Sequence, residues 1–163
     1  QSSSARHQSL DAALQQQLST ALGADITPAE CVNVGPTWIV AGLNSGAAVR
    51  ALQPDLSVLA ALSRLSGAVG ISVYGRDASG EVDLVVRSFV PADGIPEDPV
   101  CGSGNGAIAA YLQANGALPS RSYCSSQGRE IGYDGRVYLR LDEEDRVWIG
   151  GHATTAIHGA LNR

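Results

Sequence analysis

The chain has 163 residues, of which 44% are hydrophobic, and it carries a formal net charge of −5 at neutral pH. This length and hydrophobic content predict one folded domain with one sizeable core. The eleven basic residues are all arginines and are scattered, which argues against a nucleic-acid partner, because binding to a polyanion needs clustered Arg or Lys.

No apolar stretch approaches the ~20 residues that cross a bilayer, and residues 1–8 are too polar for a signal peptide. The three cysteines, Cys31, Cys101 and Cys124, lack the spacing of metal ligands or of a disulfide framework. We therefore expect a cytoplasmic protein with reduced thiols and without a membrane segment, a bound metal or a cofactor.

The first predicted element is an amphipathic helix, because leucines recur every four residues at positions 10, 14, 18 and 22. Ser9 is the expected N-cap of this helix and Gly23 its end. Two apolar runs follow at residues 31–34 and 37–43, on either side of a Gly-Pro pair. These runs predict strands.

A second helix is predicted between Pro54 and Gly67, with leucines at positions 56, 59, 62 and 65. Proline is tolerated at a helix start because its missing N–H would have no partner there. Residues 69–74 and 82–90 are then typical of strands, and residues 77–80 form a turn signal between them. We expect a hairpin.

The last third begins with a stretch rich in Pro and Gly, residues 91–106. The following residues, 107–112, carry no charge, and a helix that is apolar on every face is a buried one. We expect a largely buried helix from Gly104 to Gln113. Short strands are predicted at residues 136–141, 146–150 and 154–157.

The order of helix, strands, helix, hairpin, buried helix and strands predicts an α+β fold. Its sheet should be antiparallel or mixed, with a helix in its middle. The strict alternation of strand and helix that builds a doubly wound sheet is missing.

The segment most informative about chemistry is residues 94–106, directly before the buried helix. Its glycines let the backbone approach a ligand closely, and the N–H groups and dipole of a helix N-terminus favour an anion. A carboxylate or a phosphate could bind there. No lysine follows the glycines, and no strand-turn-helix unit with a downstream acidic residue surrounds them, so nucleotide binding is not predicted.

Three side chains of this loop are candidates for catalysis or binding. Asp98 could orient or protonate a polar group of a substrate, and Ser103 could donate a hydrogen bond. Cys101 is expected to have its thiol pKa lowered by the helix terminus. Each also has a structural explanation, Asp98 and Ser103 as turn or cap residues and Cys101 as a small buried filler.

The loop also carries a resemblance to a known family. Residues 89–91, 94–105 and 109–112 resemble the C-terminal signature of the PhzF-like (phenazine biosynthesis isomerase) family, above all in the string Glu-Asp-Pro-Val-Cys-Gly-Ser-Gly at residues 97–104. Residues 33–38 and 147–151 add flanking matches.

The resemblance implies the diaminopimelate-epimerase-like fold. In that fold each of two similar halves wraps a curved, mostly antiparallel sheet around a central buried helix, and the two helix N-termini face one another across the active-site cleft. We accordingly expect residues 1–9 to be a polar lead-in or linker and residues 10–163 to be a PhzF-like C-terminal domain.

The resemblance further implies site roles. Asp98 and Ser103 match substrate-contacting positions, and the amides of Gly102, Ser103, Gly104 and Asn105 would hold a small carboxylate-bearing substrate. Characterised members include an isomerase that moves a double bond in a dihydro-hydroxyanthranilate, with a glutamate as the proton shuttle. That glutamate belongs to the N-terminal half, so we expect the chain alone to be inactive.

The histidines do not replace the missing glutamate. The string at residues 151–154 resembles a glycine-histidine-alanine-threonine string of the missing half, but it lies where the family has a strand. We expect a structural role for His152. His7 and His158 have no constellation of chemical groups around them in the sequence.

Two alternatives to a proton-transfer isomerase remain open. Residues 101–104 also resemble the thiol loop of diaminopimelate epimerase and proline racemase, with Cys101 as the acid/base, although those enzymes need a second cysteine from the facing half. The prefix at residues 97–99 favours the PhzF-like family. The third reading is a non-catalytic half-domain that binds a small acid or dimerises. The expected partner is the missing N-terminal half or a second copy of the chain.

Overall fold

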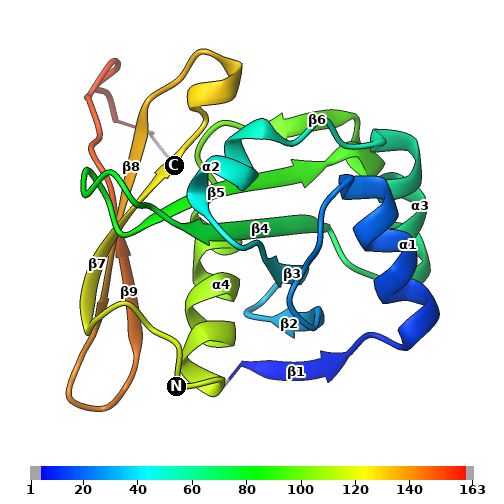
Figure 1. Cartoon of the computed structure of the whole chain (residues 1–163). Helices are drawn as coiled ribbons and strands as arrows, with labels where there is room; N and C mark the ends of the chain where they lie inside the picture. The colour runs from blue at the N-terminus through cyan, green and yellow to red at the C-terminus, as the bar shows by residue number, and fades with distance from the viewer. Residues whose placement is uncertain (1–4, 161–163) are drawn as a thin grey trace.

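The computed structural model describes residues 5–160, which form an α+β fold around one mixed sheet (Figure 1). The strands follow the order β1-β2-β3-β4-β5-β7-β8-β9, and β6 pairs with β5 beside β7. Their bounds are Arg6–Ser9 (β1), Glu30–Asn33 (β2), Thr37–Gly42 (β3), Gly70–Arg76 (β4), Leu84–Val90 (β5), Ile95–Asp98 (β6), Ser122–Gln127 (β7), Gly135–Leu141 (β8) and Val147–Gly150 (β9).

Only the pairings β3–β4 and β5–β7 are parallel within residues 5–160, so the sheet is mostly antiparallel as expected. The hairpin predicted in the middle of the chain is confirmed as β4 and β5. The helices are Ala12–Leu22 (α1), Gly46–Ala51 (α2), Leu56–Ser66 (α3) and Gly102–Ala114 (α4), with short 3-10 helices at Pro91–Asp93 (η1) and Arg129–Ile131 (η2).

The sheet has a hydrophobic core on each face, because successive side chains of a strand point to opposite sides. In β3, Ile39 and Ala41 pack toward α1, α2 and α3, whereas Trp38 and Val40 pack toward α4. The central strand β5 is buried along its whole length. The three helices on one face therefore support the strands that carry α4 on the other.

α4 is the buried central helix that the uncharged sequence predicts. Its residues from Gly104 to Leu112 are all buried, and it packs on β2, β3 and β4 on one side and on β8 and β9 on the other. Figure 1 shows the sheet bending around this helix. The prediction of a helix enclosed by a curved sheet is confirmed.

The predicted N-cap of the first helix was wrong. The N-cap of α1 is Asp11, whose side chain accepts a hydrogen bond from the N–H of Leu14, and not Ser9. Ser9 instead ends β1, which pairs with β2. The described part of the expected polar lead-in thus supplies an edge strand of the sheet.

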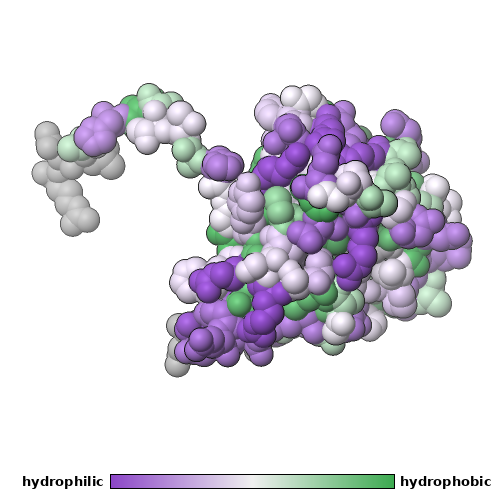
Figure 2. All heavy atoms as spheres, turned by 60° about the vertical axis from the view of Figure 1, so that its left-hand side comes forward, coloured by the Kyte–Doolittle hydropathy of each residue, from purple (hydrophilic) through white to green (hydrophobic). Residues whose placement is uncertain are grey.

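The strand predicted at residues 154–157 is also wrong. Residues 151–160 have no regular secondary structure and are exposed. Figure 2 shows this segment as an arm that extends away from the body of the molecule. A short run rich in β-branched residues does not form a strand without a neighbouring strand to pair with.

Candidate functional site

The N-terminus of α4 lies at the predicted chemical loop, and only part of its backbone is paired. The N–H of Gly104 donates to Sγ of Cys101 at 3.3 Å, and the N–H of Asn105 donates to the carbonyl of Cys101 at 3.1 Å. The N–H groups of Gly102 and Ser103 have no hydrogen-bond partner within residues 5–160. Of the four amides predicted to bind an anion, only those of Gly102 and Ser103 are therefore free to bind a ligand.

Close packing fixes the start of α4 against the sheet. A Cβ atom on Gly104 would lie 2.5 Å from Oγ of Ser72 and 2.8 Å from Oγ of Ser88, two hydroxyls that are hydrogen-bonded to each other. A Cβ atom on Gly102 would meet nothing within 4 Å. The two glycines have different roles. Gly104 permits close packing on the sheet, whereas Gly102 leaves open space beside the helix start.

Ser103 has a partner that orients its hydroxyl. The indole N–H of the buried Trp38 donates to Oγ of Ser103 at 3.2 Å, and Sγ of Cys101 lies 3.7 Å from the same oxygen. Since the indole can only donate, the Ser103 hydroxyl keeps its own proton for another acceptor. Trp38 lies in one of the sequence segments that flank the family signature.

Cys101 does not have the activated thiol that the sequence predicts. Burial raises the pKa of this thiol above its ordinary value, and that effect exceeds the lowering by the N–H of Gly104 and by Ser103. The nearby Asp98 carboxylate raises the pKa further. The prediction of a lowered pKa was wrong, because desolvation disfavours the thiolate more than the helix terminus favours it.

Asp98 is partly buried at the end of β6. Its Oδ1 accepts a hydrogen bond from the N–H of Val100 at 3.1 Å, as in an Asx turn. The carboxylate lies close enough to Cys101 to influence the pKa of the thiol. The candidate residues of the loop are therefore brought together, with Asp98, Cys101 and Ser103 around the first turn of α4.

A groove of about 580 Å³ runs along one face of α4. Among the predicted site residues, Gly102 and Ser103 line it, whereas Asp98, Cys101, Gly104 and Asn105 do not. The other lining residues come from β1, β9, the strand ends beside them and the same face of the helix: Ala5, His7, Val34, Gly106, Ala110, Gln113, Ala114, Glu144, Asp145, Arg146, Val147 and Ile149.

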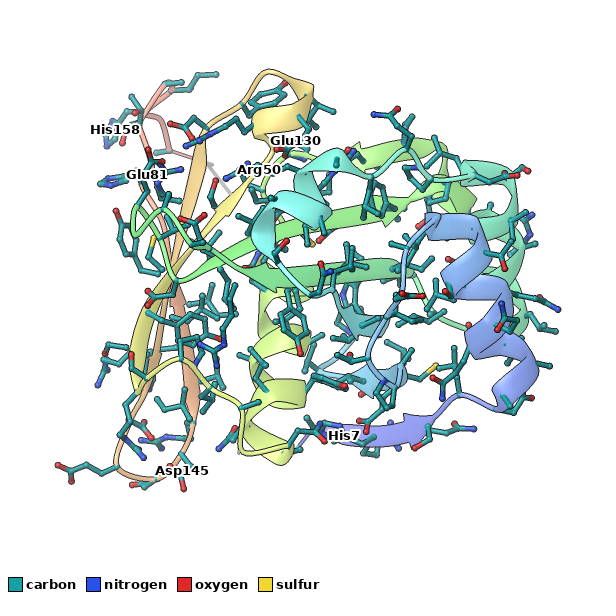
Figure 3. The ribbon with its side chains drawn as sticks, in the orientation of Figure 1. His7, Arg50, Glu81, Glu130, Asp145 and His158 are labelled. Carbon is teal, nitrogen blue, oxygen red and sulfur yellow. The ribbon has the colours of Figure 1, made fainter. Side chains whose placement is uncertain are left out.

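His7 has a charged neighbour that the sequence does not reveal. Nδ1 of His7 lies 2.8 Å from Oε2 of Glu30, and His7 lines the groove. Figure 3 shows His7 on β1 at the bottom of the view, well separated from His158 at the upper left. His152 lies on the exposed arm with its ring edge-on to that of Tyr138, and not in the strand that the resemblance implies at this position.

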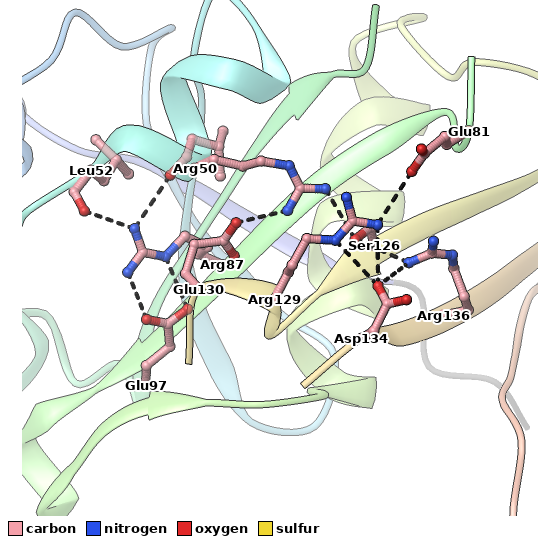
Figure 4. Close-up of polar contacts among 11 residues, drawn as sticks. Arg50, Leu52, Glu81, Arg87, Glu97, Ser126, Arg129, Glu130, Asp134 and Arg136 are labelled. Atoms are coloured by element: carbon pink, nitrogen blue, oxygen red, sulfur yellow. Dashed lines mark hydrogen bonds and ion pairs between the residues drawn. The ribbon is translucent and has the colours of Figure 1, made fainter. Parts of the chain in front are cut away.

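Glu97, part of the family signature, is not available to a ligand. Its carboxylate binds the guanidinium of Arg87 through two hydrogen bonds of 2.9 and 2.7 Å (Figure 4). Arg87 also donates to the carbonyl of Leu52 at 2.8 Å. This buried ion pair ties β6 to β5 and to the end of α2, and nothing in the sequence spacing points to it.

Within the described part of the chain, no group of three His, Cys, Asp or Glu side chains is placed to hold a metal ion. No helix between residues 5 and 160 has the length and apolar character needed to span a membrane.

Comparisons with known proteins agree with the fold and the loop. The family described as phenazine biosynthesis-like protein (PhzC-PhzF) matches residues 1–159. An uncharacterized isomerase of Deinococcus radiodurans is 34% identical over 140 residues, which cover 81% of this chain and 45% of the relative. The uncharacterized isomerase YddE of Escherichia coli K12 is 33% identical over 140 residues, with 80% and 46% coverage.

A solved structure shows the same fold. The crystal structure of a phenazine biosynthesis protein of the PhzF family from Enterococcus faecalis superposes with a TM-score of 0.64 at 31% identity, covering 83% of this chain and 46% of that one. The chain spans about half the length of the relatives it matches. With its α+β fold and its signature loop at the start of α4, the chain belongs to the phenazine biosynthesis-like (PhzC-PhzF) family.

Proposed function

We propose that the chain is the C-terminal domain of a PhzF-like isomerase or epimerase, which acts by proton transfer on a small carboxylate-bearing metabolite without a cofactor. The observation that carries this proposal is the pair of unpaired N–H groups, Gly102 and Ser103, at the N-terminus of a helix beside a groove. Such N–H groups and the helix dipole favour a negatively charged ligand group.

In the proposed roles, backbone N–H groups and side chains bind different groups of the substrate. The N–H groups of Gly102 and Ser103 bind its carboxylate, and the Ser103 hydroxyl, held by Trp38, donates a further hydrogen bond. Asp98 orients or protonates a polar group of the substrate at the other side of the first turn. The acid/base glutamate comes from an N-terminal half, which is consistent with the coverage of about half of each relative.

The thiol-based epimerase is the weaker alternative. Cys101 is 4% exposed, does not line the groove, and has a raised pKa. A general acid/base works best when its pKa lies near the working pH, and the raised pKa moves the thiol away from that range. Its burial also keeps the thiol away from a ligand in the groove.

A binding and turnover experiment tests the proposal. In the purified chain, benzoate should shift the amide NMR signals of Gly102 and Ser103, whereas the neutral analogue benzamide should not. A dihydro-hydroxyanthranilate should not be converted, because general acid–base catalysis contributes ~10²–10⁴-fold and its glutamate is absent.

Four results would contradict the proposal. Equal shifts with benzamide would mean that the loop does not recognise the anion. Turnover by the chain alone that disappears in Cys101→Ser would favour the thiol mechanism, and turnover that survives this substitution would require Asp98 to act alone. Absence of both binding and turnover would favour a half-domain that only associates.

The proposed partner is the N-terminal half or, for the chain alone, a second copy. Strands β1 and β9 end the sheet of the described residues, and both contribute to the groove beside α4. Unpaired strand edges next to an apolar surface favour association. Light scattering at micromolar concentration should show a dimer. A monomer would contradict self-association, and protection of β1 and β9 from hydrogen exchange would locate the interface.

A further inference from the structure

The chain turns into α4 at a junction between two strands. β6 runs antiparallel to β5 and ends at Asp98, opposite Ser88. β7 runs parallel to β5 and ends at Gln127, opposite Val86. The C-terminal ends of β6 and β7 therefore approach each other along the same edge of β5. Since sheet pairing of β6 stops at Asp98, the turn from there to α4 depends on other contacts.

The side chain of Gln127 makes those contacts. Its Nε2 donates to the carbonyl of Asp98 at 2.8 Å. Its Oε1 accepts from the N–H of Cys101 at 3.1 Å and from Nδ2 of Asn105 at 2.8 Å. One side chain therefore holds the end of β6, the residue before α4 and the first turn of α4.

Two further buried residues close this network. Oγ of Ser125 donates to Oδ1 of Asn105 at 2.6 Å, and Nδ2 of Asn105 also donates to the carbonyl of Cys101 at 2.9 Å. Gln127 and Ser125 are 0% exposed and Asn105 is 1% exposed. A buried polar network whose members are all hydrogen-bonded is rigid and favours one arrangement, since any other leaves polar groups without partners.

The backbone beside Gln127 supports the same turn. Gly128 has a φ of 85°, and a Cβ atom there would lie 2.3 Å from the carbonyl oxygen of Pro99. The residue after Gln127 therefore allows the turn to pack directly on the end of β7.

We propose that Gln127 is a positioning residue, which holds the turn from Asp98 to Cys101 so that the N–H groups of Gly102 and Ser103 face the groove. The use of those N–H groups for a ligand rests on the proposed function, whereas the positioning itself does not. Gln127 lies 22 residues beyond Asn105 and outside the family signature quoted above.

The test replaces Gln127 by methionine, which has a similar length and no hydrogen-bonding amide. Under native conditions, labelling of Cys101 by a thiol reagent, localised by mass spectrometry, should accelerate roughly tenfold or more, because local opening exposes the thiol. Hydrogen exchange of the amides of Cys101 and Asn105 should accelerate with it. Leu59→Ala is the control, since Leu59 is fully buried in the core on the other face of the sheet.

The labelling must be compared at equal global stability, adjusted with urea. Faster labelling in Gln127→Met than in Leu59→Ala supports the proposal, and equal labelling overturns it. If Gln127→Met does not fold, Ser125→Ala removes only the bond to Asn105 and should accelerate labelling to a smaller extent. No acceleration in Ser125→Ala would then overturn the proposal.

A benzoate titration separates this proposal from the proposed function. If the unsubstituted chain binds benzoate, Gln127→Met should bind it roughly tenfold more weakly, whereas Leu59→Ala should bind it equally well. Equal binding by Gln127→Met would overturn the positioning role. If the unsubstituted chain does not bind benzoate, the proposed function fails, and the labelling experiment still decides the role of Gln127.

Discussion

Replacing Glu97 by glutamine is expected to lower the free energy of unfolding by about 3–5 kcal/mol. The side chains of Arg87 and Glu97 are only 8% and 5% exposed, so the arginine left behind would be a buried charge without a counter-charge. The cost should be visible in urea unfolding as a lower midpoint at unchanged slope.

Two further variants define what the ion pair contributes. Arg129→Met is the control, because Arg129 is 41% exposed and its pairs with Glu81 and Asp134 are surface pairs, each worth about 0–1 kcal/mol. The double variant Arg87→Met/Glu97→Met should regain part of the loss, since no buried charge remains, although the carbonyl of Leu52 loses its donor. A cost for Glu97→Gln no larger than that for Arg129→Met would contradict the buried-pair interpretation.

The sequence predicts the main elements where hydrophobic spacing is strong. Leucine periodicity locates α1 and α3, and the charge-free run locates α4, although α4 begins at Gly102, two residues before the expected start at Gly104. The short helix α2 has only six residues, too few for a periodic pattern, and its N-cap Ser45 is a weak signal without one.

Strand β7 was not predicted because its side chains are mostly polar. Ser125, Ser126 and Gln127 are nevertheless fully buried, since their partners come from distant parts of the chain. Ser125 and Gln127 bind Asn105, and Ser126 accepts a hydrogen bond from Arg50. Hydrophobic patterns cannot identify such a strand, because what stabilises its burial is a tertiary hydrogen-bond network.

The candidate site was likewise predictable only in part. Glycines before an uncharged helix predict the loop and its position at a helix N-terminus, which the structure shows. The same glycines do not reveal which amides are paired, and the signature does not reveal that Glu97 is bound to Arg87. Those facts depend on contacts between residues that the sequence separates.

Replacing each of two glycines in the first turn of α4 by alanine should change the free energy of unfolding by very different amounts. In Gly104→Ala the new methyl group would overlap the hydroxyls of Ser72 and Ser88, so the helix start must move away from the sheet. We expect the free energy of unfolding to fall by about 1–3 kcal/mol. In Gly102→Ala the methyl group meets no neighbour, so the free energy of unfolding should change by less than about 1 kcal/mol.

Ligand binding should show the opposite order, with Gly102→Ala losing more affinity than Gly104→Ala. Gly102 lines the groove beside its free N–H, so a methyl group there occupies the space where a carboxylate would sit. We expect Gly102→Ala to bind benzoate at least roughly tenfold more weakly while keeping a native unfolding curve, because a charge-assisted hydrogen bond to the ligand is worth about 1–2 kcal/mol. Urea unfolding and a benzoate titration of both variants measure the two effects, and each variant is the control for the other. Native binding by Gly102→Ala would mean that the ligand does not use this helix terminus, and an unchanged stability of Gly104→Ala would mean that the contact with Ser72 and Ser88 is loose.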